Sequence, residues 1–135
     1  MINLIYGGKG SGKTAAIVAL ANENVKKAKG FHIYIDKSNS RMHDLDHDVK
    51  LVDAKEYGIN TATEFVAFIK GMVAVNYDIE KIYIDNLCKI ITAELNDIES
   101  VFSGIEYISS LMGVDFVVTA NAEKDELPKF LHKYL

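Results

Sequence analysis

Apolar residues fall into two kinds of run along this chain, and the two kinds alternate. Short, nearly unbroken runs occur at Ile2–Tyr6, Phe31–Ile35, Lys81–Asp85 and Val114–Thr119, each bounded by glycine or polar residues. Runs of this length are typical of strands that are buried on both faces of a sheet. A fifth and shorter run at Val49–Val52 predicts an additional strand. The pattern therefore predicts four or five strands.

Between these runs, apolar residues recur at the three- and four-residue spacing of an amphipathic helix. One such stretch follows Gly12, and another follows Thr61, which forms a capping-box pattern with Glu64. A third, at 87–113, predicts one long helix or two shorter ones. Alternating strands and helices predict an α/β fold, a three-layer αβα sandwich with a mainly parallel sheet of four to five strands. We expect residues 1–135 to form a single domain.

The strongest chemical signal lies between the first strand and the first helix. From Gly7 to Thr14 the chain reads GGKGSGKT, which fits the pattern G-x-x-x-x-G-K-[ST]. Glycines let successive backbone N–H groups turn toward phosphate oxygens, and the N-terminus of the following helix adds partial positive charge. In such a loop the lysine reaches the β- and γ-phosphates and the hydroxyl ligates Mg²⁺. The expected nucleotide-binding residues are Gly8, Lys9, Gly10, Ser11, Gly12, Lys13 and Thr14.

This loop resembles the Walker A motif of the P-loop NTPase superfamily. The resemblance implies a Rossmann-like αβα sandwich and a Mg-nucleotide ligand. The run Ile82-Tyr83-Ile84-Asp85 looks like a Walker B strand, whose terminal carboxylate supports the metal in this superfamily. The resemblance therefore implies that Thr14 and Asp85 hold Mg²⁺.

A third segment, at 117–121, ends in polar residues. In ATPases similar to the AAA+ and RecA-like groups, a polar residue at this place senses the γ-phosphate, which nominates Thr119 and Asn121. We accordingly predict that Lys13, Asp85 and Asn121 act in catalysis. The resemblance is to the RecA-like and AAA+ side of the superfamily, and it does not single out one family.

Two features depart from the pattern of a fast ATPase. Many ATPases of this kind place a glutamate directly after the metal-supporting aspartate, whereas this chain has Asn86. An amide accepts no proton at neutral pH, so general-base catalysis, worth about 10²–10⁴-fold, requires another carboxylate, for which Asp36 is a candidate. Arg41 is the sole arginine, so it is the one candidate for an arginine finger across a subunit interface.

Composition narrows the choice of ligand and setting. The net charge of −4 does not favour nucleic acid as a partner. Cys88 is the only cysteine, no apolar stretch approaches the roughly 20 residues of a membrane span, and the N-terminal residues lack signal-peptide features, so we expect a cytoplasmic protein.

The guanine-recognition pattern [NT]-K-x-D is missing, which favours ATP over GTP. His43, Asp44, Asp46, His47 and Asp48 form a dense set of metal-ligand types that we interpret as a solvated loop.

The sequence thus predicts an ATP-binding protein that uses Mg²⁺ and is a slow or partner-activated ATPase. Two alternatives remain open at this stage. One is a phosphotransferase acting on a nucleoside or another small hydroxyl compound, with Asp36 as the base. The other is an interaction module that binds nucleotide without hydrolysing it and presents a surface to a protein partner or to a second copy of the chain.

Overall fold

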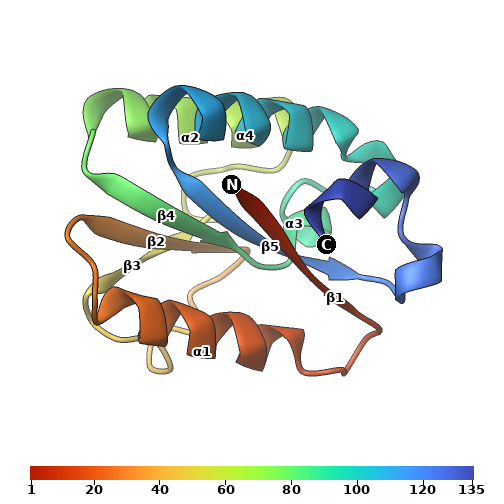
Figure 1. Ribbon diagram of the computed structural model, residues 1–135, viewed down its shortest axis with the longest axis horizontal. Coiled ribbons are helices and arrows are strands. Elements are labelled where there is room, and N and C mark those ends of the chain that lie inside the picture. The colour runs from red at the N-terminus through yellow and green to blue at the C-terminus, as the bar shows by residue number, and fades with distance from the viewer.

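The computed structural model describes residues 1–135 as an α/β fold built on a five-stranded sheet in which every pair of neighbouring strands is parallel (Figure 1). The strand order is β1-β5-β4-β2-β3. The strands are β1 (Ile2–Gly7), β2 (Phe31–Asp36), β3 (Val49–Asp53), β4 (Ile79–Ile84) and β5 (Asp115–Asn121). The expected parallel α/β sandwich is confirmed, and the short run at Val49 is a strand at one edge of the sheet.

Helices cover both faces of this sheet. Helix α1 (Lys13–Val25) lies on one face, and α2 (Ala62–Val75) and α4 (Glu99–Met112) lie side by side on the other (Figure 1). The stretch expected as one or two helices contains the short α3 (Leu87–Ile90), a 3₁₀ turn and then α4. The 3₁₀ segments are Leu95–Asp97, Lys124–Glu126 and Lys129–Tyr134.

Apolar packing explains the two helical layers. The larger core cluster lies between the sheet and the α2/α4 layer, where Phe65 and Ile105 are fully buried. A smaller cluster lies under α1, where Ile17 packs with the tyrosines of β2 and β4, Tyr34 and Tyr83. Burying side chains of this size removes apolar surface from water, the main favourable term in folding. Both faces of the central strands are therefore apolar, as their unbroken runs predict.

The capping-box residues of α2 lie at the start of the helix, as the sequence predicts, with one difference from the standard pattern. The Thr61 hydroxyl accepts a hydrogen bond from the Glu64 N–H at 3.1 Å and so caps α2. The Glu64 carboxylate accepts from the N–H of Asn60 at 3.1 Å, one residue earlier than in a standard capping box, and from the Thr61 hydroxyl. Gly113 ends α4 in the left-handed conformation, with φ of 71°.

The topology brings distant residues together at one edge of the sheet. All strands are parallel, so their carboxyl ends lie at the same edge, where ligands of open α/β sheets bind. Strand β5 lies between β1 and β4, and Gly7 pairs with Asn121 in the β1–β5 register. The ends of β1, β5 and β4 therefore lie next to one another. No helix combines the length and apolar character needed to cross a bilayer.

Candidate functional site

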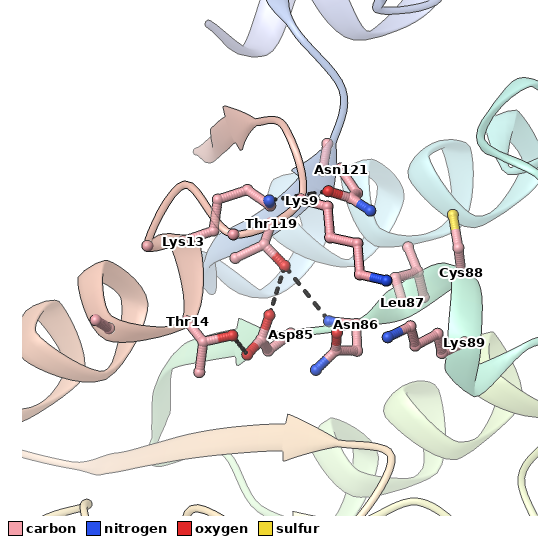
Figure 2. A pocket seen from close by; sticks show the side chains of 14 residues that line it. Lys9, Lys13, Thr14, Asp85, Asn86, Leu87, Cys88, Lys89, Thr119 and Asn121 are labelled. Carbon is pink, nitrogen blue, oxygen red and sulfur yellow. Dashed lines mark hydrogen bonds between the residues drawn. The ribbon is translucent and has the colours of Figure 1, made fainter.

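A cavity of about 420 Å³ opens at this edge of the sheet (Figure 2). It is lined by the glycine-rich loop and the start of α1, by the ends of β4 and β5, and by α3. Of the residues predicted to form the site, those that line the cavity are Lys9, Gly10, Gly12, Lys13, Thr14, Asp85, Thr119 and Asn121. Gly8 and Ser11 belong to the same loop but do not line the cavity. The fold thus collects most of the predicted site residues around one opening.

The loop between β1 and α1 has the backbone conformation that its glycines permit. Gly10 and Gly12 have φ of 79° and 89°, in the left-handed region that residues with a β-carbon adopt at a cost. Gly12 is the N-cap of α1, and the Ser11 N–H donates to the Gly8 carbonyl at 3.1 Å. The first turn of α1, with its unpaired N–H groups, therefore begins at the wall of the cavity.

Lys13 projects from this turn to the end of β5. Its Nζ donates to the Gly8 carbonyl at 2.8 Å and to the Asn121 side-chain oxygen at 3.0 Å. Both acceptors are neutral, and Lys13 forms no ion pair. No carboxylate is therefore paired with the Lys13 ammonium beside the cavity.

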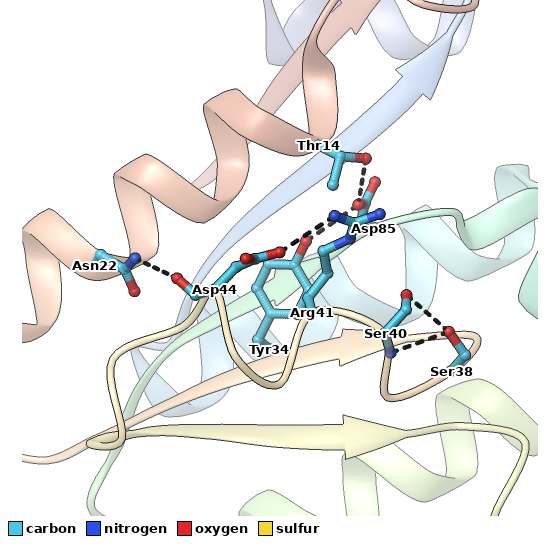
Figure 3. Close-up of polar contacts among 8 residues, drawn as sticks. All are labelled: Thr14, Asn22, Tyr34, Ser38, Ser40, Arg41, Asp44 and Asp85. Carbon is cyan, nitrogen blue, oxygen red and sulfur yellow. Dashed lines mark hydrogen bonds and ion pairs between the residues drawn. The ribbon is translucent and has the colours of Figure 1, made fainter.

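Asp85, directly after β4, is the centre of a hydroxyl network (Figures 2 and 3). Its side chain is buried, with 2% of the residue exposed. One carboxylate oxygen accepts from the Thr14 hydroxyl at 2.8 Å and from the Tyr34 hydroxyl at 3.1 Å, and the other accepts from the Thr119 hydroxyl at 2.7 Å. All three donors are neutral, and no basic side chain forms an ion pair with Asp85.

Tyr34 is a member of this network that the sequence does not reveal. It lies within β2, where its apolar neighbours predict only a core residue, and it is fully buried. Burial raises the pKa of its hydroxyl, and the negative charge of Asp85 raises it further. Tyr34 therefore stays a hydrogen-bond donor to Asp85 across the physiological pH range.

Asp36 and Asn86 form a second, partly buried contact near the Asp85 network. The Asn86 side-chain amide donates to Asp36 Oδ1 at 3.0 Å, and the Lys37 N–H donates to the same oxygen at 2.7 Å. Only 1% of Asp36 is exposed, and the pKa of its carboxyl is raised, chiefly by burial, although these two hydrogen bonds oppose the rise. Asn86 lines the cavity, whereas Asp36 does not. The Asn86 side chain is thus engaged with the neighbouring acid.

Arg41 lies in the loop after β2, and Figure 3 shows its side chain extending alongside Tyr34 toward the side where Asp85 lies. Its Nη1 pairs with the Asp44 carboxylate at 3.2 Å. The Asn22 side chain of α1 holds this loop, because it donates to the Asp44 carbonyl at 2.9 Å and accepts from the Asp46 N–H at 2.8 Å. The Arg41 loop is therefore held against α1 of its own chain, although Arg41 does not line the cavity.

The His and Asp residues of the same loop only partly gather. Ligand atoms of Asp46, His47 and Asp48 lie within 4.8 Å of one another, whereas His43 and Asp44 are not part of that group. The Asp46 carboxylate accepts from the Asp48 N–H at 2.9 Å and so closes a turn. His47 is 92% exposed. These contacts are those of a solvated loop.

Glu123 contacts the glycine-rich loop from the segment after β5. Its Oε1 accepts from the Gly8 N–H at 3.1 Å, and a β-carbon at Gly8 would lie 3.0 Å from the same oxygen. The sequence gives no signal for this contact, because the two residues are 115 positions apart. A carboxylate thus neighbours the loop predicted to bind phosphate.

The cavity is lined by the ammonium group of Lys13, the buried carboxylate of Asp85 and the hydroxyl groups of Thr14 and Thr119. Such a set can bind an anion through Lys13 and a hard cation through Thr14 and Asp85. No protein-family model matches the sequence, and no curated protein is similar to it.

Proposed function

We propose that the cavity binds ATP with Mg²⁺ and that the protein is a slow or partner-activated ATPase of the P-loop type, on the RecA-like and AAA+ side of that superfamily. The observation that carries the proposal is the environment of Asp85. A buried carboxylate is costly unless it is paired with a cation or coordinates a metal, and here its partners are three neutral hydroxyl groups. A cation beside Asp85 would supply the missing charge.

The donor set fits Mg²⁺. Hard oxygen ligands suit this ion, and it is commonly held by one or two protein oxygens together with water and substrate phosphates. The Thr14 hydroxyl and the Asp85 carboxylate are 2.8 Å apart and border the same cavity. When bound, Mg²⁺ would neutralise charge on the β- and γ-phosphates.

The phosphates themselves would lie against Lys13 and the first turn of α1. The helix N-terminus offers backbone N–H groups and partial positive charge, and the Lys13 ammonium is already held at the cavity by Gly8 and Asn121. Asn121 is hydrogen-bonded to Lys13, so a phosphate that draws the lysine away changes the contacts of Asn121. This coupling suits Asn121 as a sensor of the γ-phosphate.

Slow turnover follows from the shortage of a general base. Asp85 is the only acidic residue that lines the cavity, and the proposal assigns it to the metal. Asp36 is buried and outside the cavity, and Asn86 donates its amide to it. A protein partner or a second copy of the chain, or a rearrangement that exposes Asp36, would then be needed for fast hydrolysis. We place this activity in the cytoplasm, where ATP is abundant and a free thiol such as Cys88 stays reduced.

Calorimetry with Mg-ATP tests the assignment. The wild type is expected to bind, and Lys13→Ala is expected to lose most of the affinity because it removes the cation at the cavity. Lys26→Ala is the matched control, since Lys26 is exposed just beyond the end of α1 and lines no part of the cavity. Equal binding by wild type and Lys13→Ala would contradict the proposal.

The observation that no free base lines the cavity also favours a second function, an interaction module that holds ATP without hydrolysing it. The two functions differ in the fate of the nucleotide. A module of this kind retains intact ATP over many minutes, whereas an ATPase releases ADP with water as the acceptor. ADP release that depends on an added hydroxyl compound would instead identify a phosphotransferase.

A further inference from the structure

A second cavity, of about 340 Å³, lies at the same edge of the sheet, beyond the ends of β2 and β3. Three lysines line it, Lys37 after β2, Lys55 after β3 and Lys89 on α3. No acidic residue lines this cavity, and none of the three lysines takes part in an ion pair. In a chain whose net charge is −4, three unpaired cations around one cavity make a local concentration of positive charge.

The rest of the lining indicates the size and character of the anion. Ile59 and Ile90 are buried and contribute apolar surface, while Asn60 and Thr92 contribute an amide and a hydroxyl whose side chains form no hydrogen bond within the protein. A volume of this order suits a small molecule. Single-stranded nucleic acid relies on stacking against aromatic side chains, and no lining residue is aromatic. A small organic phosphate with hydroxyl groups fits these features.

Helix α3 connects this cavity with the first one. The only two non-glycine residues with positive φ, Asn86 at 60° and Thr92 at 53°, stand on either side of α3. Asn86 lines the first cavity, Thr92 lines the second, and Lys89 lines both. A β-branched residue in the left-handed region is strained, and such strain concentrates at ligand sites and switch regions. A shift of α3 would therefore alter both cavities.

We infer that the second cavity binds a small organic phosphate through Lys37, Lys55 and Lys89, and that its occupancy is coupled through α3 to the nucleotide site. Binding in the second cavity stands on its own residues. The coupling rests on the proposed function, because it requires a nucleotide in the first cavity.

NMR titration of backbone amides with glycerol 3-phosphate tests the binding. Saturable shifts are expected at the residues that line the second cavity, with none from glycerol, which lacks the phosphate. Lys55→Gln removes one charged hydrogen bond and should weaken binding about tenfold, whereas Lys26→Gln should leave it unchanged. Inorganic phosphate should bind more weakly than the ester, because it has no glycerol hydroxyl groups to hydrogen-bond with Asn60 and Thr92.

The binding inference fails if the wild type gives no saturable shifts, if Lys55→Gln binds as well as the wild type, or if inorganic phosphate binds as tightly as the ester. Spectra of the variants that overlay the wild type away from the cavity show that each is folded. Lys13→Ala should still bind glycerol 3-phosphate, so loss of ATP binding and loss of this site are distinguishable.

Calorimetry with Mg-ATP, with and without saturating glycerol 3-phosphate, tests the coupling. The Mg-ATP affinity of the wild type is expected to change at least about twofold when the second ligand is present, because coupling is a free energy shared by the two sites. Lys55 lines only the second cavity, so the Lys55→Gln variant should bind Mg-ATP like the wild type when the ester is absent. An unchanged affinity in the wild type would overturn the coupling.

Discussion

The Thr14 hydroxyl donates to the Asp85 carboxylate at 2.8 Å and so joins the first turn of α1 to the end of β4. The two residues are 71 positions apart. The parallel sheet makes this contact possible, because the chain returns to the same edge after each crossover helix. Together with the Tyr34 and Thr119 hydroxyl groups, the contact holds the Asp85 carboxylate in one orientation at the cavity.

Thr14→Val should remove the Mg²⁺-dependent part of ATP binding. Valine keeps the shape of threonine but has no hydroxyl to ligate a metal, so we expect the affinity for Mg-ATP to fall by about tenfold or more, the effect of one charged hydrogen bond. Calorimetry with and without Mg²⁺ measures this difference, and Thr14→Ser, which keeps the hydroxyl, should resemble the wild type. A valine variant whose affinity still rises on adding Mg²⁺ as it does in the wild type would remove Thr14 from the metal site.

Asp36→Asn should make the protein more stable at neutral pH. Burial raises the pKa of Asp36 above the ordinary value of 3.8, so the folded state holds the proton more tightly than the unfolded state. Between the unfolded and the folded pKa, stability therefore falls as pH rises, and above both values the buried charge costs free energy. Asparagine keeps an oxygen for the Asn86 amide and the Lys37 N–H, and it carries no charge.

Urea denaturation across a pH series measures this effect. The gain in the free energy of unfolding from Asp36→Asn should be small near pH 3.8 and should increase as pH rises through the folded pKa. Asp97→Asn, at an exposed position, is the control. A constant difference between Asp36→Asn and wild type over the whole series would show that Asp36 does not titrate in this way.

Glu123→Gln should increase the affinity for ATP. The Glu123 carboxylate contacts the Gly8 N–H at 3.1 Å, and its negative charge opposes phosphate binding at the same loop. Glutamine keeps an oxygen acceptor for this N–H and removes the charge. We expect a gain of about two- to tenfold that shrinks at high salt, because exposed charges are screened. Calorimetry at two salt concentrations checks it, with Asp125→Asn as the control; a loss of affinity in Glu123→Gln would mean that the charge supports the loop.

The sequence predicts most of the fold because its apolar runs and its helical spacing agree with each other. Every strand read from an apolar run is present, and the edge strand β3 extends one residue beyond Val49–Val52. Each of these signals is local. The order of the strands is not a local property, since it depends on which crossover packs on which face of the sheet. No residue pattern predicts that β5 lies between β1 and β4.

The candidate site is likewise only partly predictable from the sequence. The glycine-rich loop and Asp85 are visible in the sequence because spacing and position after a strand mark them. Tyr34 and Glu123 are not, because each acts through a partner far along the chain, Asp85 and Gly8 respectively. The contact between Asn86 and Asp36 is similarly hidden, although each residue directly follows a strand run and both are predicted to be relevant to hydrolysis.

Arg41 should act on the site of its own chain and not across a subunit interface. The Asn22 side chain ties the Arg41 loop to α1 of the same chain, and the positive charge of Arg41 reaches Tyr34, where it lowers the pKa against the larger effect of burial. Arg41 does not line the cavity, so this role requires its loop to close on the nucleotide. If the protein hydrolyses ATP in that way, Arg41→Gln should slow the reaction, since an arginine near the γ-phosphate stabilises the charge of the transition state.

Mixing two defective variants separates the two arrangements of Arg41. Lys13→Ala removes the phosphate contact of one chain, and Arg41→Gln removes the arginine of the other. With Arg41 acting in its own chain, no chain in the mixture has both residues, so the ATPase rate should equal the sum of the two separate rates. An arginine supplied across an interface would instead complete the Arg41→Gln site with the arginine of a Lys13→Ala neighbour and would raise the rate above that sum. Mixtures of wild type with Lys13→Ala show whether inactive chains alter the rate by themselves.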